Sequence, residues 1–186
     1  MNSAASKKFS DGEYIVHQGD AADCMYVIDS GVVEVVGRTD GREVSLALLG
    51  AGEFFGEMGL FEGGVRTAGV RAFGDAEVGT LDRTRFLARV QEDPSLAYQI
   101  LHRMSERGRE LTLRLYELGA LRPAELDAFK ASGNAYPVPL AKDGFAQRAQ
   151  KDPKVALSML NDMSSHIRDM NGRLLALTAF DPEQFR

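Results

Sequence analysis

The stretch Phe55-Gly56-Glu57-Met58-Gly59-Leu60-Phe61-Glu62-Gly63-Gly64-Val65-Arg66-Thr67-Ala68 decides the organisation of this chain. Gly56 permits a backbone conformation closed to other residues, and a short helix after it would direct free N–H groups at an anion. Arg66 adds a guanidinium whose fork of donors fits two phosphate oxygens. Glu57 only accepts hydrogen bonds when ionised, so it suits a hydroxyl group. These residue types predict a pocket for a small anionic polyol.

Around this stretch, from Phe9 to Leu81, short apolar runs alternate with turn signals. The runs at 32–36 and 44–48 are rich in β-branched residues, and Asp40-Gly41 between them is typical of a hairpin turn. Regularly spaced short strands predict an antiparallel barrel or sandwich. Further turn signals lie at 12, 19–20, 29–31, 50–52, 63–64 and 74–75.

After Asp93-Pro94 the apolar period changes from that of strands to that of a helix. Steps of four and three residues lay an apolar seam along one long helix, and Glu110 and Arg114 can pair on its flank. The seam consists of Ala97, Leu101, Met104, Gly108, Leu111, Leu115 and Leu118. A seam this regular predicts a homodimer through the long helices, although one-sided packing onto the strands is the simpler alternative.

The last third of the chain repeats this pattern 59 residues later. Gln91-Glu92-Asp93-Pro94 is echoed by Gln150-Lys151-Asp152-Pro153, and the offset 150 − 91 = 59 also aligns the helical seam. The second seam consists of Ala156, Leu160, Met163, Ile167, Met170, Leu174 and Leu177. We interpret this as a partial duplication of the last strands and helices, starting near Phe129 and lacking the pocket. The alternative is that helices with similar tasks look alike. Prolines at 137 and 139 predict a loop or sheet edge there.

Composition narrows the classes of function. With 186 residues, of which 44% are hydrophobic, the chain can bury a real core, and its net charge of −5 argues weakly against a nucleic-acid surface. The single cysteine, Cys24, fits a reducing compartment and a buried apolar position better than a reactive thiol. The three histidines are far apart, so zinc is not expected. With no signal peptide, membrane span or catalytic motif in the sequence, we expect a cytoplasmic protein that is not an enzyme.

Gly56-Glu57-Met58-Gly59-Leu60 followed by Arg66-Thr67-Ala68 resembles the phosphate-binding cassette of cyclic nucleotide-binding domains, such as those of catabolite-activator and protein-kinase regulatory proteins. The likeness covers roughly residues 9–118. It implies an α+β fold, an antiparallel, jelly-roll-like β-roll with flanking helices and a C-terminal helical extension. We therefore expect a nucleotide-binding part at 1–118 and a helical extension at 119–186.

The resemblance also implies the roles of individual residues. Arg66 would bind the cyclic phosphate and Glu57 a ribose hydroxyl, while Thr67 would reach the phosphate or the base edge. The resemblance places other ligand contacts at Phe55, Gly56, Met58, Gly59, Leu60 and Ala68, with Val35, Leu46 and Thr112 near the base. The simpler alternatives are core packing for Val35 and Leu46, and an exposed helix face for Thr112.

Three functions are compatible with these features. The first is a regulatory sensor that binds cAMP or cGMP, moves its C-terminal helices and acts on a downstream effector protein; the choice of base stays open. The second is a DNA-binding transcription regulator of the catabolite-activator type. Residues 122–186 show no helix-turn-helix pattern with a basic recognition helix, which makes nucleic acid an unlikely partner. The third is a ligand-free interaction scaffold.

Overall fold

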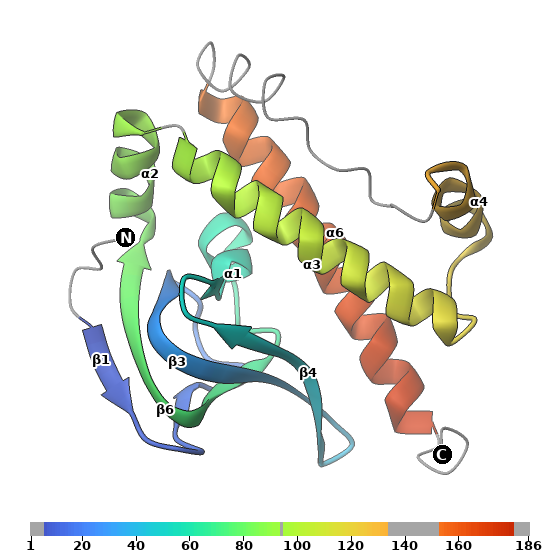
Figure 1. Cartoon of the computed structure of the whole chain (residues 1–186), viewed down its shortest axis with the longest axis horizontal. Coiled ribbons are helices and arrows are strands. Elements are labelled where there is room, and N and C mark those ends of the chain that lie inside the picture. Colours follow the sequence, from blue (N-terminus) through green and yellow to red (C-terminus); the bar gives the residue numbers. More distant parts are fainter. Residues whose placement is uncertain (1–5, 94, 134–152, 181–186) are drawn as a thin grey trace. The chain divides into compact units, whose positions relative to one another are not determined.

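A computed structural model describes residues 6–93, 95–133 and 153–180 of the chain (Figure 1). The chain divides into two compact units, Met1–Phe86 with Leu175–Arg186, and Leu87–Leu174. This division differs from the expected boundary at residue 118. The long helix falls in the second unit, whereas the last helix is divided between the two units after Leu174.

The first unit contains an antiparallel sheet. Its strands are β1 (Ser6–Phe9), β2 (Tyr14–Val16), β3 (Cys24–Thr39), β4 (Arg42–Gly50), β5 (Phe54–Phe55) and β6 (Gly69–Asp82). They follow the order β1-β6-β3-β4, with β2 paired to β6 and β5 paired to β3. The expected α+β class with an antiparallel β-roll is confirmed.

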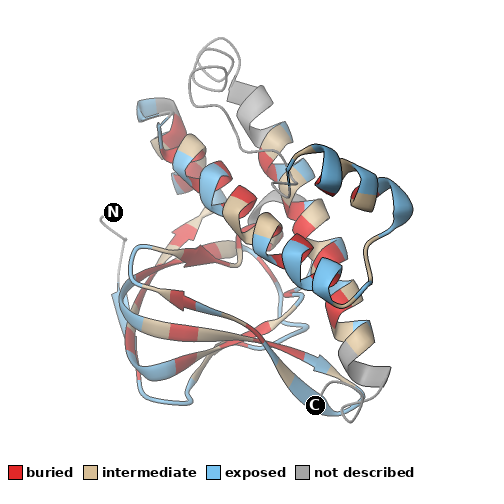
Figure 2. Ribbon diagram, turned by 45° about the vertical axis from the view of Figure 1, so that its right-hand side comes forward, coloured by how far each residue is buried: buried red, intermediate tan, exposed pale blue. Residues whose placement is uncertain are grey.

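Buried and exposed residues alternate along these strands (Figure 2). The alternation sends every second side chain inward, which is why the β-branched runs form half-buried strands. The inward residues form one apolar core made of Phe9, Val16, Ile28, Val33, Leu49, Phe55, Val70, Ala72, Ala76 and Val78. This core supports β5, which leads directly into the cassette.

The turn signals have two different outcomes. Asp40 and Gly41 have φ of 50° and 76° and join β3 to β4 with Thr39 opposite Arg42, so the expected hairpin is confirmed. At residues 29–31, in contrast, β3 continues, and its register with β6 shifts at Ser30. Gly31 has φ of 81°, and a Cβ there would lie 2.2 Å from the carbonyl oxygen of Asp75. This turn signal therefore marks an irregularity within one long strand.

The helices comprise α1 (Glu57–Glu62), α2 (Arg83–Glu92), α3 (Ser95–Glu117), α4 (Pro123–Ala131) and α6 (Pro153–Phe180). The expected long helix is α3, and its apolar seam is buried from Ala97 to Leu115. Leu118, the last residue of the expected seam, is half-buried and lies after the end of α3. The seam residues Leu160, Ile167, Met170 and Leu174 of α6 are buried as well. In the second unit α3 and α6 lie side by side and run in the same direction (Figure 1).

Only the helical half of the expected duplication can be followed in the structure. Ser95–Glu117 and Pro153–Phe180 are both helices. The offset of 59 residues relates Ala131 to Ala72. Ala131 is the last residue of helix α4, whereas Ala72 lies in strand β6. The prediction that the last strands are repeated is therefore wrong at this position. The prolines at 137 and 139 lie outside the described residues.

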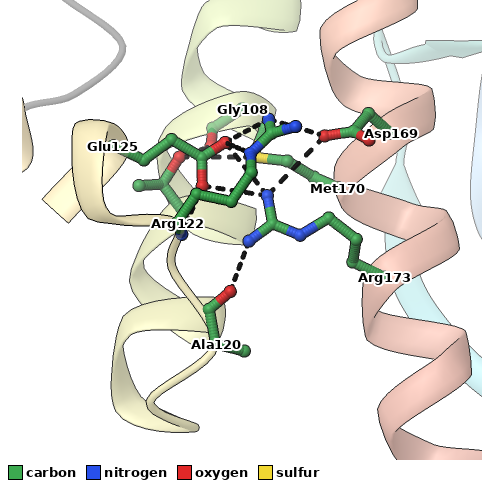
Figure 3. A network of polar contacts seen from close by, with 8 residues as sticks. Gly108, Ala120, Arg122, Glu125, Asp169, Met170 and Arg173 are labelled. Atoms are coloured by element: carbon green, nitrogen blue, oxygen red, sulfur yellow. Dashed lines mark hydrogen bonds and ion pairs between the residues drawn. The ribbon is translucent and has the colours of Figure 1, made fainter.

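A network of charged side chains joins α4 to α6 (Figure 3). The buried carboxylate of Glu125 accepts hydrogen bonds from the backbone N–H of Arg122 at 2.9 Å and from Nη1 of Arg173 at 2.9 Å. Arg173 also donates to the carbonyl oxygen of Ala120, and Nη2 of Arg122 lies 2.9 Å from Oδ2 of Asp169. Burial alone would raise the pKa of Glu125, but its hydrogen bonds from Arg122 and Arg173 outweigh burial and hold the pKa at about 2.

This depressed pKa predicts an acid-sensitive contribution to stability. Glu125 has a lower pKa in the folded chain than in the unfolded one, so its stabilising effect is present above the ordinary glutamate pKa of 4.5 and is lost as pH falls toward 2. We expect Glu125→Gln to lower the free energy of unfolding at neutral pH by up to about 3 kcal/mol. Urea unfolding at a series of pH values measures this difference, with exposed Asp127→Asn on the same helix as control. An equal loss in both variants, or a loss that persists unchanged at pH 2, would contradict the assignment.

Within the described residues, no helix combines the length and apolarity needed to cross a bilayer.

Candidate functional site

The cassette begins at a sharp backbone turn after β5. Phe55 pairs with Tyr26 of β3, and Gly56 then adopts φ of 74° immediately before α1 begins at Glu57. A Cβ at Gly56 would lie 2.6 Å from Nη1 of Arg66. Glycine is therefore required at this position by the left-handed backbone and by the close approach of the guanidinium.

The far end of the cassette is held by a second chain segment. The backbone N–H of Arg66 donates to the carbonyl oxygen of Asp20 at 2.8 Å, and the N–H of Gly19 donates to the carbonyl oxygen of Arg66 at 2.9 Å. A Cβ at Gly59 in α1 would lie 2.1 Å from the Cβ of Ala22, so the helix packs directly on this segment. These contacts fix the position from which the Arg66 side chain extends.

The guanidinium of Arg66 points back to the start of α1. Its Nη1 donates to the carbonyl oxygens of Cys24 at 2.8 Å and Gly56 at 3.0 Å, and Nη2 lies 3.4 Å from the Cys24 sulfur. Its central carbon lies 5.3 Å from the centroid of the Tyr26 ring. Arg66 is only 5% exposed. The two ends of the cassette, 10 residues apart in sequence, therefore meet in space.

The charge of Arg66 is not neutralised inside the described part of the chain. Its described contacts are two carbonyl oxygens, a sulfur and an aromatic ring, none of them anionic, and its buried Nε has no hydrogen-bond partner. A buried guanidinium without a counter-charge is costly, and a buried N–H without an acceptor adds to that cost. A bound anion beside Nε would remove both costs. The geometry therefore fits the anion site expected from the sequence.

Glu57 is the first residue of α1 and is 1% exposed. It directly follows Gly56, whose carbonyl oxygen accepts a hydrogen bond from Arg66. The expected carboxylate and the expected guanidinium therefore lie at the same end of α1. An ionised carboxylate only accepts hydrogen bonds, and the contact of Glu57 with a ligand hydroxyl stays a prediction.

The other expected contacts fall into three groups. Thr67 is exposed and its Oγ1 lies 3.7 Å from the sulfur of Met58, so these two residues come together within the cassette. Phe55 and Leu46 are buried, and Val35 is half-buried against the core of the sheet. Gly59 is buried and Ala68 half-buried, whereas the side chain of Leu60 lies outside the described residues.

Thr112 does not lie on an exposed helix face. It is 0% exposed, its hydroxyl donates to the carbonyl oxygen of Gly108 at 2.7 Å, and it lies 3.4 Å from the sulfur of Met170 in α6. The alternative that Thr112 lies on an exposed helix face is therefore wrong. Its hydroxyl is engaged between α3 and α6, and its contact with a base stays a prediction.

Two residues of the site were not expected from the sequence. Tyr26 stacks on Phe55 at 4.9 Å and lies against Arg66. Burial raises the pKa of Tyr26 to about 12, with Cys24 adding to the rise and the Arg66 charge opposing it, so its phenol is neutral at physiological pH. Cys24 is half-buried and contacts Arg66, which corrects the expectation of a buried apolar position. Because side chains alternate along a strand, the sequence predicts that Cys24 and Tyr26 lie on the same face of β3. Their positions in the sequence do not predict that this face contacts Arg66.

Comparison with known proteins shows the family to which this part of the chain is similar. Residues 6–93 match the family described as the cyclic nucleotide-binding domain. This part of the chain belongs to that family. The cyclic nucleotide-binding domain contains the whole cassette together with all six strands of the sheet.

Two relatives illustrate the range of proteins that carry this domain. The Cyclic AMP receptor protein of Thermus thermophilus is 38% identical over 109 residues, which cover 58% of this chain and 50% of the relative. The cAMP-dependent protein kinase type II regulatory subunit of Drosophila melanogaster is 46% identical over 69 residues, covering 37% of this chain and 18% of the relative. The chain spans about half the length of the bacterial regulators that it matches.

Among solved structures, the regulatory domain of Toxoplasma gondii PKA in co-crystals with cAMP is similar to this chain. It is 31% identical and has a TM-score of 0.42, and the match covers 44% of this chain and 32% of that one.

The ring of Tyr26 predicts a measurable effect on nucleotide binding. We expect Tyr26→Ala to weaken binding by about 0.5–2 kcal/mol, because the aromatic face that holds Arg66 is lost. Tyr26→Phe keeps this face and should bind within about 2-fold of the wild type, since the loss of a neutral hydroxyl leaves the cation–π contact intact. Fluorescence competition with a labelled cyclic nucleotide measures both variants. Equal weakening in the two would assign the effect to the hydroxyl instead of the ring.

Proposed function

We propose that this chain is a non-enzymatic sensor that binds cAMP or cGMP at the cassette. The observation that carries the proposal is the buried guanidinium of Arg66, with one unpaired N–H and no carboxylate partner among the described residues, beside the start of α1. The cyclic phosphate would bind Arg66, and Glu57 would accept a hydrogen bond from the ribose. Met58 and Thr67 would lie next to the base, whether it is the adenine of cAMP or the guanine of cGMP.

The signalling step follows from differential affinity. A ligand shifts an equilibrium between two arrangements only if it binds one of them more tightly. The phosphate of the ligand would form an ion pair with the unpaired guanidinium of Arg66. Ligand binding would therefore stabilise the arrangement in which Arg66 lies next to the start of α1. Rearranged C-terminal helices would then act on a downstream effector protein, in the cytoplasm.

Thermal unfolding of the whole chain with cAMP, cGMP and linear 5′-AMP tests the proposal. A ligand that binds the folded chain at 100 times its Kd stabilises it by about 2.7 kcal/mol. We expect the melting temperature to rise with at least one cyclic nucleotide and to change little with 5′-AMP. No shift with either cyclic nucleotide would favour the ligand-free scaffold.

A second candidate is a DNA-binding regulator, which the names of bacterial relatives such as the transcriptional regulator Vfr of Pseudomonas aeruginosa favour. That relative is matched over only 56% of its length. A salt-dependent gel shift on duplex DNA, with and without cyclic nucleotide, separates this candidate from the sensor. Retarded duplex in the presence of ligand would support the regulator.

The homodimer expected from the long helix stays a prediction.

A further inference from the structure

Helices α3 and α6 pack in the same register that relates their sequences. The hydroxyl of Thr112 lies 3.4 Å from the sulfur of Met170, a separation of 170 − 112 = 58 residues. The sequence repeat aligns Met170 with Leu111, at an offset of 59. At this contact, Met170 of α6 thus lies within one position of its own counterpart in α3. Because the two helices are also parallel, they form the arrangement that two copies of α3 would adopt in a symmetric parallel pair (Figure 1).

The apolar seams of both helices contain buried residues. In α3 the buried seam residues are Ala97, Leu101, Met104, Leu111 and Leu115, and in α6 they are Leu160, Ile167, Met170 and Leu174. Buried serines, Ser105 and Ser164, lie beside the two seams at equivalent positions, 164 − 105 = 59. Polar residues at matched positions of a helix pair favour one register over others. The large apolar residues that α3 leaves exposed are Leu113 and Tyr116, which lie outside the seam.

The charged residues beside the seam are also duplicated. In α6, Asp169 and Arg173 lie 3.6 Å apart and bind Arg122 and Glu125 at the start of α4 (Figure 3). The counterparts of Asp169 and Arg173 in α3, at an offset of 59, are Glu110 and Arg114, which carry the same charges at the same spacing. The α3 helix of a second copy would therefore present the same apolar seam and the same charges to this surface.

We propose that α6 takes the place of a second copy's α3 and makes the chain a monomer with an internal pseudo-dimer. The duplicated helix satisfies the α3 seam within one chain, so the seam accepts another copy of the chain only when α6 is displaced. This covered seam replaces the homodimer interface expected from the sequence. The proposal does not depend on ligand binding.

Mass in solution gives the first test. Light scattering coupled to size exclusion, over a wide range of concentrations and without nucleotide, should give the monomer mass of 20.3 kDa throughout. A wild-type dimer, whether formed through the seam or by exchange of α6 between chains, would overturn the proposal.

A substitution that displaces α6 gives the second test. Met170→Asp places a carboxylate in the buried seam, which disfavours the packing of α6. We expect a concentration-dependent increase to twice the monomer mass, because the α3 seam becomes available to a second copy. Adding Leu111→Asp in α3 should return the mass to that of the monomer. Asn161→Asp adds the same charge on the exposed side of α6 and should stay monomeric.

Retention of the β-sheet amide signals in NMR spectra verifies that these variants keep the first unit folded. A Met170→Asp variant that stays monomeric, or one whose association survives Leu111→Asp, would contradict the equivalence of α6 and a second α3. If Met170→Asp does not fold, the mass of the wild-type chain in solution still tests whether the chain is a monomer.

Discussion

Replacing Arg66 with alanine is expected to weaken cyclic nucleotide binding by about 2–5 kcal/mol, roughly 30-fold or more. Arg66 is almost fully buried and holds the start of α1 through the carbonyl oxygen of Gly56. The substitution removes the one buried cation beside α1 among the described residues and leaves the phosphate without a partner. Isothermal titration calorimetry measures the loss.

Two further variants sharpen this result. Arg66→Lys keeps the charge but not the fork of donors, so its affinity should lie between those of the wild type and Arg66→Ala. Arg42→Ala removes an exposed arginine from β4 and should bind as the wild type does. Unchanged affinity in Arg66→Ala would remove Arg66 from the site, and equal losses in Arg66→Ala and Arg42→Ala would show a nonspecific effect of net charge.

Gly56→Ala should impair both stability and binding. Its φ of 74° costs a residue with a Cβ about 1–2 kcal/mol. The new Cβ would also lie 2.6 Å from Nη1 of Arg66 and 3.4 Å from Cδ2 of Tyr26, so the guanidinium has to move. We expect an additional loss of affinity of about 10-fold, since one misplaced charge-assisted hydrogen bond is worth about 1.5 kcal/mol. Chemical unfolding and calorimetry measure the two effects.

Gly41→Ala is the matched control for this substitution. Gly41 has φ of 76° in the β3–β4 hairpin, and a Cβ there would have no atom within 4 Å. It should therefore show a similar loss of stability with unchanged affinity. If Gly56→Ala binds nucleotide as tightly as Gly41→Ala, the contact between Gly56 and Arg66 does not position the guanidinium for the ligand.

Local chemistry predicted the elements that depend on neighbouring residues. The Asp40-Gly41 pair indicated a tight turn between two strands, and steps of four and three residues indicated α3, because both patterns reflect contacts within a few residues. The turn signal at 29–31 predicted a turn between two strands, but β3 continues through these residues. A glycine with positive φ is found in an irregular strand as well as in a turn, so the sequence alone does not separate the two. Pairing with β6 decides between the two, and that pairing joins residues about 50 apart.

The same distinction applies to the site. Gly56, Glu57 and Arg66 lie within one short segment, so their spacing was informative. Tyr26 and Cys24 reach Arg66 from a strand about 40 residues earlier, and only the pairing of β5 with β3 brings them there. Thr112 illustrates the converse, because its exposure depends on α6, which packs on α3 from much later in the sequence. The helical repeat was visible in the sequence, but its in-register packing was not.

Calorimetric titration of the whole chain with cAMP and with cGMP, beside Arg66→Lys, tests the binding site most directly. We expect saturable binding of one cyclic nucleotide per chain, with clearly lower affinity in the lysine variant. A wild-type chain that binds neither nucleotide, or a lysine variant that binds as tightly as the wild type, would contradict an anion site built on the buried guanidinium.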